Sequence, residues 1–231
     1  MSIESLVNLD WQWLRVFNGS DSLFWDGFMA TCTAGLTWLP MYLALAYMIV
    51  RNGDARKAAI TIGGALACVL LVTIIDNGMV KPWVARPRPL NDPVLGHTVL
   101  TVAGIQEDDF SFFSAHAANT ASLTVFLCLV VRHRALSIAL VCWSLLNGYT
   151  RLYLGMHFPL DVLTGFIAGS FIALFVYAIY RWVLRFVTAE TRFISSQYTS
   201  TGYSLDDVDV VMLVMALTIF FAVLRALIIA L

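Results

Sequence analysis

Long apolar runs alternate with short polar segments along most of this chain. Six of the runs approach the length of about 20 apolar residues that a helix needs to cross a bilayer core. They fall at roughly 28–50, 58–80, 113–131, 136–154, 159–180 and 210–231. The pattern predicts an all-α membrane bundle of about six transmembrane helices. The last run is the least secure span because it contains Arg225.

The residues before the first run are patterned differently. From Leu6 to Phe17, apolar side chains recur at helical spacing, with charged and polar side chains among them. This pattern favours a short amphipathic helix on the membrane surface, within an N-terminal leader that covers 1–27. A plain solvated leader is the alternative.

Composition supports the membrane assignment. The chain is 60% hydrophobic and 13% charged and has a mean hydropathy of +0.80, whereas a soluble domain carries about 25% charged residues. We therefore expect one membrane domain, 1–231, in which a five-helix portion, 28–187, is joined by a polar linker, 188–209, to a last span, 210–231. The net charge of −1 gives no reason to expect a nucleic-acid partner.

Basic residues are distributed unevenly between the two expected faces. With six spans, the loops after the first, third and fifth carry eight lysines and arginines, and the other face carries two outside its polar motifs. Loops rich in basic residues stay in the cytoplasm. Both termini and the polar motifs are therefore expected to face outward, toward the periplasm or extracellular side of a membrane such as the bacterial inner membrane.

The polar motifs lie at the ends of four neighbouring runs, on that outward face. Charges are expensive at membrane depth, so such a cluster marks a functional site. From the second run to the fifth, the residues are Lys81 and Arg88, Ser114 and His116, Arg151, and His157 and Asp161.

Three of these residues are cations suited to bind an anion. Lys81 offers a compact charge, and Arg88 and Arg151 offer planar forks of donors that match a phosphate. Together they supply enough charge to hold a phosphate dianion without a metal, so no cofactor is expected. Arg86 is a candidate fourth charge. Prolines on either side of Arg88 fix an extended path that aims it and Lys81 at a common point, although each cation taken alone reads as an interfacial basic residue.

The second motif stands at the expected start of the third helix. There, free backbone N–H groups and the helix dipole favour an anion beside Ser114. Equally, Ser111 or Ser114 reads as a simple N-cap. His116 lies within the first turn of the helix. A lone histidine at such a position is more often structural, but beside a second histidine in the same set it reads as an acid or base.

His157 and Asp161 are four residues apart and share one face of a helix. An aspartate that is hydrogen-bonded to one ring nitrogen would fix the tautomer and leave the other nitrogen free to attack. The pair therefore has the arrangement of a histidine nucleophile and the residue that orients it.

The three stretches resemble the motifs of the type 2 phosphatidic acid phosphatase superfamily of integral membrane phosphatases. Its motif K-x6-R-P is matched by Lys81, Arg88 and Pro89; its P-S-G-H appears as Phe113-Ser114-Ala115-His116; and its S-R-x5-H-x3-D appears as Thr150-Arg151, His157 and Asp161. The departures at Phe113, Ala115 and Thr150 remove no group that performs chemistry. The resemblance implies an active, metal-independent lipid phosphatase.

The resemblance also implies roles for the residues that match. His157 would be the nucleophile that forms a phosphohistidine, with Asp161 as its partner, and His116 would protonate the leaving group. Lys81, Arg88, Ser114 and Arg151 would hold the phosphate.

The substrate preference follows from family analogy and topology alone. An outward-facing site in a short chain favours undecaprenyl pyrophosphate, if the source is bacterial. Phosphatidylglycerol phosphate, phosphatidic acid and lipid A are the competing lipid phosphates. Two other classes stay open, namely a transporter or channel that binds an anion without breaking a bond, and a structural membrane protein with a degenerate site.

Acidic residues near the motifs have two readings each. The run from Glu107 to Asp109 precedes the third helix and reads either as a divalent-cation site or as a solvated loop. Asp76 lies about a turn before Lys81 and reads as a group that tunes the lysine or as a helix cap.

Overall fold

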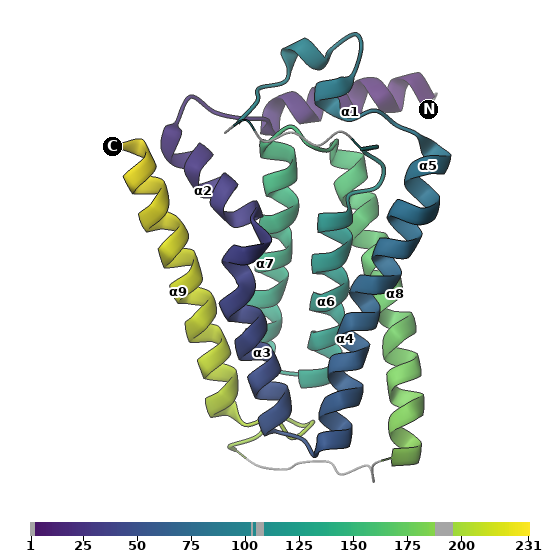
Figure 1. The fold of residues 1–231 in the computed structure, drawn as a ribbon, viewed down its shortest axis with the longest axis vertical. Coiled ribbons are helices and arrows are strands. Elements are labelled where there is room, and N and C mark those ends of the chain that lie inside the picture. The colour runs from purple at the N-terminus through teal and green to yellow at the C-terminus, as the bar shows by residue number, and fades with distance from the viewer. Residues whose placement is uncertain (1–2, 103, 105–108, 188–195) are drawn as a thin grey trace.

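The computed structural model describes residues 3–102, 104, 109–187 and 196–231, and the regular structure within these ranges is helical. Long helices run side by side, and α1 lies across one end of the bundle (Figure 1). The α-helices are α1 (Ile3–Phe17), α2 (Leu23–Thr33), α3 (Leu39–Arg51), α4 (Ala55–Ile75), α5 (Lys81–Val84), α6 (Ala115–Val131), α7 (Arg134–Tyr153), α8 (Pro159–Val187) and α9 (Leu205–Ala230). Shorter turns are η1 (Gly35–Trp38), η2 (Asp76–Val80), η3 (Pro89–Asn91) and η4 (Gly96–Thr98). The predicted all-α bundle is confirmed.

The amphipathic N-terminal helix is present as α1. Its Trp11 and Leu14 are buried, whereas Trp13 and Val16 are exposed on the other side. The ring of Trp11 packs edge-on against Phe158, at 5.0 Å between centroids. This contact attaches α1 to the segment between α7 and α8, where the third motif lies.

The first apolar run does not form one straight helix. It divides into α2 and α3, which are bent by 70° at η1. The break has a local cause, because Ala34 takes an extended conformation and Pro40 occupies the first turn of α3, where its missing N–H costs nothing. Trp38 closes the bend by donating from Nε1 to the carbonyl oxygen of Cys32 at 2.8 Å.

The number of membrane spans is left as a prediction. Among the described residues, three helical stretches are long and apolar enough to cross a membrane, namely Ala55–Asn91, Pro159–Val187 and Leu205–Ala230, and the bent pair α2 and α3 would make a fourth. The last apolar run, the least secure span by sequence, forms α9. This helix is among those suited to cross a membrane. The shorter α6 is also apolar.

Two glycines of α8 bring that helix unusually close to α6. A Cβ atom at Gly169 would lie 2.2 Å from the carbonyl oxygen of Ala118, and one at Gly165 would lie 2.7 Å from that of Ser114. Only a residue without a side chain permits such a contact. The start of α6 is therefore held directly against the start of α8, and this contact places the second motif beside the third.

Both ends of the described chain lie at the end of the bundle that carries α5 (Figure 1). The links from α3 to α4 and from α6 to α7 lie at the opposite end. The chain therefore has the relative arrangement expected from its sequence, with the termini and the motif-bearing helix ends on one side.

Candidate active site

The first motif follows a change in helical geometry. After α4, the chain makes a π-helical turn, η2, before α5 begins at Lys81. A π turn adds a residue to the helical repeat and rotates the residues after it, and such turns are frequent at functional sites. Ala85 then adopts a left-handed conformation, with φ of 47°, and Arg88 is extended. As a result, Lys81 and Arg88 both reach the same point.

That point is occupied by the carboxylate of Asp109. Lys81 Nζ lies 2.6 Å from Asp109 Oδ2, and Arg88 Nε lies 2.9 Å from Oδ1, with Nη2 of the same arginine on that oxygen as well. Burial works against ionisation of Asp109, but its hydrogen bonds with Lys81 and Arg88 outweigh it and hold the pKa of the carboxyl below its usual value. Two cations thus converge on one anion, as the sequence predicted for a phosphate.

The acidic run therefore has a use that the sequence reading missed. Asp109 pairs with Lys81 and Arg88, so its carboxylate does more than face solvent. Glu107 and Asp108 lie outside the described residues. Asp76 is the C-cap residue of α4 and also contacts the same lysine, with its Oδ2 at 3.5 Å from Lys81 Nζ, so its position fits both readings.

His157 adjoins this anion site through Arg88. Arg88 Nη1 lies 3.1 Å from His157 Nε2 and 2.9 Å from the carbonyl oxygen of Met156. Arginine only donates hydrogen bonds, so Nε2 is the acceptor and carries the lone pair. Burial lowers the pKa of His157 to about 4, and the positive charges of Arg151 and Arg88 act in the same direction. The ring is therefore neutral near pH 7, with its basic nitrogen turned toward the anion site.

The other ring nitrogen reaches Asp161 through a serine. His157 Nδ1 lies 3.3 Å from Ser111 Oγ, and the Ser111 hydroxyl donates to Asp161 Oδ2. The direct separation between Nδ1 and that carboxylate oxygen is 3.8 Å, which is too long for a hydrogen bond. The expected His–Asp pair is therefore present with Ser111 between its members, a relay that the four-residue spacing alone does not reveal.

Arg86 does not add a fourth charge to the phosphate site. Its Nη1 lies 2.7 Å from Asp161 Oδ1 and its Nη2 lies 2.7 Å from Asp10 Oδ2. Its guanidinium also stacks over the ring of Phe158, at 3.8 Å from the centroid. The arginine instead fixes Asp161 from the side away from His157 and ties it to α1.

Asp10 is a second residue that sequence reasoning missed. It is 2% exposed although it lies on the amphipathic helix, and its Oδ1 accepts from the backbone N–H of Leu160 in the first turn of α8. Burial raises the pKa of this carboxyl, and its hydrogen bonds with Leu160 and Arg86 oppose the rise. The sequence held only a weak signal, since Asp10 looks like any other polar residue on the helix.

Ser114 caps α6 and is also fixed to the third motif. Its Oγ accepts from the backbone N–H of Ala117 at 3.5 Å, so the N-cap reading holds. Its own N–H donates to the carbonyl oxygen of Asp161 at 3.1 Å. The N-terminus of α6, which attracts anions, therefore lies at the His157–Asp161 loop.

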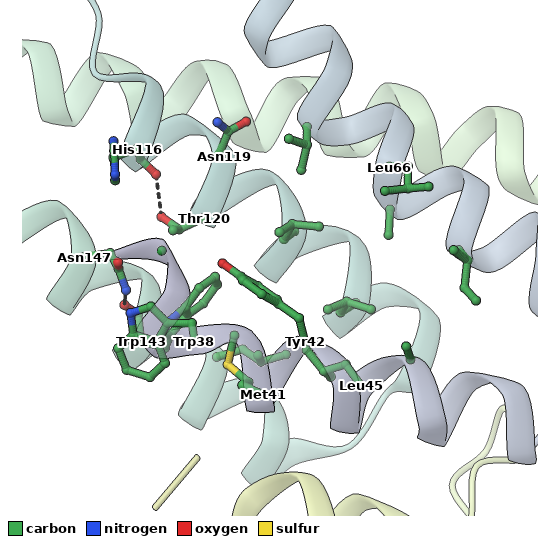
Figure 2. A pocket seen from close by; sticks show the side chains of 18 of the residues that line it. Trp38, Met41, Tyr42, Leu45, Leu66, His116, Asn119, Thr120, Trp143 and Asn147 are labelled. Atoms are coloured by element: carbon green, nitrogen blue, oxygen red, sulfur yellow. Dashed lines mark hydrogen bonds between the residues drawn. The ribbon is translucent and has the colours of Figure 1, made fainter. Parts of the chain in front are cut away.

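Arg151 and His116 belong to α7 and α6, and the charge of Arg151 acts on the ring of His157. Arg151 is 2% exposed, and its Nη1 lies 3.0 Å from Thr33 Oγ1 at the end of α2. Thr150, which stands where the family motif has serine, donates to the same hydroxyl at 3.2 Å. His116 lies in the first turn of α6, and its side chain also lines an apolar cavity inside the bundle (Figure 2).

Comparisons with known proteins agree with this geometry. Residues 58–185 match the model of the PAP2 superfamily. A lipid A 4′-phosphatase of Bacteroides thetaiotaomicron is 40% identical over 173 residues, which are 73% of this chain and 76% of that protein. The undecaprenyl-diphosphatase BcrC of Bacillus subtilis is 28% identical over 130 residues, which are 56% of this chain and 62% of that one.

A solved structure shares the fold. It is the crystal structure of a transmembrane PAP2 type phosphatidylglycerolphosphate phosphatase from Bacillus subtilis, which superimposes with a TM-score of 0.59 at 22% identity and covers 79% of this chain and 89% of its own. The matched family model spans all three motifs and the helices that position them. The chain belongs to the PAP2 superfamily and is an integral membrane lipid phosphatase that acts without a metal.

Proposed function

We propose that this phosphatase removes a phosphate from a lipid of the lipid A type, with His157 as its nucleophile. One observation carries the catalytic part of the proposal. The unprotonated Nε2 of a neutral, buried histidine borders a point where Lys81 and Arg88 already hold an anion. A phosphate at that point lies within reach of a nucleophile whose other nitrogen is held by a relay.

The first step transfers the phosphoryl group to the protein. The lone pair of His157 Nε2 forms a bond to phosphorus while the bond from phosphorus to the lipid oxygen breaks. His116 donates a proton to that oxygen as it leaves. The ring becomes cationic, and the relay through Ser111 to the Asp161 carboxylate stabilises its charge.

The second step regenerates the protein. A water molecule attacks phosphorus, His116 accepts one of its protons, and the bond between phosphorus and Nε2 breaks. Throughout, Lys81, Arg88 and Arg151, with the N-terminus of α6 at Ser114, bind the non-bridging oxygens. Charge stabilisation of this kind is the main contribution a protein makes to phosphoryl transfer.

The substrate assignment rests on similarity. Two lipid A 4′-phosphatases match over most of this chain, that of Bacteroides thetaiotaomicron at 40% identity over 73% of it and that of Porphyromonas gingivalis at 28% over 78%. The undecaprenyl-diphosphatase BcrC matches less of it, at 56%. Undecaprenyl pyrophosphate, which the sequence reading preferred, is therefore the second candidate. An outward-facing site, as the basic loops predict, would meet either lipid at the periplasmic side.

The test is release of inorganic phosphate by detergent-purified protein in the presence of EDTA. The substrates are lipid A, undecaprenyl pyrophosphate, phosphatidylglycerol phosphate and phosphatidic acid. We expect lipid A to be preferred and the His157→Ala variant to be inactive. His97→Ala is the matched control, because His97 lies in η4 outside the motifs and should keep full activity.

Other outcomes identify the competing functions. Phosphate binding without release in a folded protein would favour an anion-binding transporter or channel. Neither binding nor release would favour a degenerate site. Release that survives His157→Ala would overturn the nucleophile assignment, and a preference for undecaprenyl pyrophosphate would replace the substrate assignment alone.

A further inference from the structure

A cavity of about 460 Å³ lies inside the bundle next to the active site (Figure 2). Its walls come from the bend between α2 and α3 and from the inner faces of α3, α4, α6 and α7, and they are mostly apolar. Its volume is in the range of sites that bind small organic molecules. The cavity is therefore large enough to hold part of a lipid.

The cavity has a polar end and an apolar end. His116, Asn119, Thr120 and Asn147 gather at one end in Figure 2, and Leu45 and Leu66 lie toward the other. The polar end contains His116, the residue proposed above to protonate the leaving oxygen. A lipid with its phosphate between Lys81 and Arg88 would thus have the start of its tail at this end.

Two buried polar atoms in the cavity walls have no hydrogen-bond partner among the described residues. They are the indole Nε1 of Trp143 and the side-chain oxygen Oδ1 of Asn119. Trp143 is only 4% exposed. A buried polar group left unsatisfied costs about 1–3 kcal/mol, and this cost is not offset inside an apolar bundle. Both residues line the cavity, so a ligand that enters it, with a small shift of either side chain, is the available source of a partner.

The other tryptophan of the cavity shows that the fold is able to satisfy an indole here. Trp38 packs edge-on against Trp143, at 5.8 Å between ring centroids, and its Nε1 donates to the carbonyl oxygen of Cys32. Both rings line the same cavity, yet one N–H is used within the protein and the other has no partner among the described residues. This difference points to a ligand and not to a general shortage of acceptors.

We propose that the cavity binds the acyl chain of the substrate and recognises an amide or hydroxyl group near the head of that chain. The proposal rests on the proposed phosphatase function and names the tail that the same site accepts. Trp143 Nε1 requires an acceptor, which a carbonyl or hydroxyl oxygen supplies. Asn119 Oδ1 requires a donor, which an amide N–H or a hydroxyl supplies.

The polar atoms of Trp143 and Asn119 discriminate between three classes of lipid phosphate. A chain that carries an amide or a hydroxyl satisfies both atoms. The ester carbonyl of a diacylglycerol phosphate satisfies Trp143 alone. A prenyl chain satisfies neither, because it is hydrocarbon throughout, and it would leave both atoms buried and unsatisfied. A site built to bond a polar group rejects a ligand that lacks it more strongly than an apolar site rejects an extra group.

The experiment compares kcat/KM for three purified lipids. They are a glucosamine-based lipid phosphate with amide-linked 3-hydroxyacyl chains, phosphatidic acid, and undecaprenyl phosphate. We expect this order of activity in the wild type. Trp143→Phe keeps a ring and removes the N–H, so activity on the first two lipids should fall about tenfold relative to undecaprenyl phosphate, the equivalent of one hydrogen bond. Asn119→Leu should lower activity on the amide-linked lipid alone.

Trp38→Phe is the matched control. It removes an N–H that is already paired within the protein, so it should lower the melting temperature while the ratios between the lipids stay as in the wild type. If Trp143→Phe does not fold, the lipid ratios of Asn119→Leu alone test whether the cavity recognises a polar group of the lipid.

The outcomes separate this inference from the phosphatase function. Active variants whose lipid ratios equal those of the wild type would overturn the assignment of the cavity, as would a wild type that prefers undecaprenyl phosphate, and both would leave the phosphatase function intact. A wild type that releases phosphate from none of the three lipids would overturn both.

Discussion

The site that holds Asp109 and the cavity beside it satisfy their polar groups in opposite ways. In the first, the charged side chains of Lys81, Arg88 and Asp109 are paired with one another at hydrogen-bond distance. In the second, Trp143 and Asn119 each present a buried polar atom without a partner among the described residues. The proposed phosphate site thus holds a carboxylate of the protein itself between its two cations. The tail site is completed only by the lipid that it binds.

This difference assigns separate tasks to the two regions. In the proposed function, the charges that converge on one point recognise the phosphate common to all the candidate lipids, so they would govern catalysis. The cavity meets the part of the substrate in which those lipids differ, so it governs selectivity. Substitutions at the charged site should therefore act on every lipid alike, whereas those in the cavity should alter ratios between lipids.

The largest effect is expected at Asp161. Asp161→Asn removes the charge that would stabilise the cationic ring of the proposed phosphohistidine, and it weakens the contacts to Ser111 and Arg86. By analogy with catalytic triads, kcat should fall by about 10³–10⁴-fold on all lipids equally. The measurement is steady-state phosphate release from lipid A and phosphatidic acid. A loss of activity on only one of the two lipids would contradict the assignment of catalysis to the charged site and of lipid selectivity to the cavity.

A smaller effect is expected at Asp10, which acts as a positioning residue through Arg86. Asp10→Asn weakens the bonds to Arg86 Nη2 and to Leu160 N, so kcat should fall about tenfold with KM unchanged, and stability by about 1–3 kcal/mol. Glu4→Gln is the control, because Glu4 lies exposed on the same helix and should change neither. A rise in KM without a fall in kcat would show that Asp10 instead contributes to binding.

Removing the internal carboxylate should improve binding. Asp109→Asn leaves Lys81 and Arg88 without the anion that competes with substrate, so KM should fall about two- to fivefold, as for a partly exposed ion pair. Inhibition by inorganic phosphate should strengthen to the same extent. A weaker inhibition would mean that Asp109 supports the cations and does not compete with the phosphate.

The smallest change concerns pH. Because burial lowers the pKa of His157 to about 4, the acid limb of kcat/KM due to this ring should lie near pH 4, well below the value of about 6.5 for a free histidine. Stability should follow the same window. Between about pH 6.5 and 4 the unfolded chain binds a proton that the folded ring does not, so stability falls as pH falls. His157→Gln should remove this contribution, as measured by thermal unfolding across that range.

The sequence predicted that the motif residues gather at one end of the bundle, and part of that prediction rests on local geometry. Lys81 and Arg88 flank prolines, His157 and Asp161 lie within one loop and turn, and helix ends at one face bring the groups together. The roles of Ser111 and Asp10 could not be predicted from the sequence. Their contacts to Asp161 and Arg86 join distant parts of the chain, and no local sequence spacing indicates such contacts. The bend at η1 has a signal in the sequence, because Pro40 lies in the middle of the apolar run 28–50, which the hydropathy pattern predicts as one span.

The close contact of α8 with α6 has a consequence for how the protein opens. At Gly165 and Gly169 the backbones of the two helices touch without intervening side chains, and Ser114 N–H bonds the Asp161 carbonyl oxygen at the same place. Neither helix start has room to loosen alone. The amides of residues 114–118 and 161–165 should therefore exchange with deuterium as one cooperative unit, at a rate distinct from that of α1.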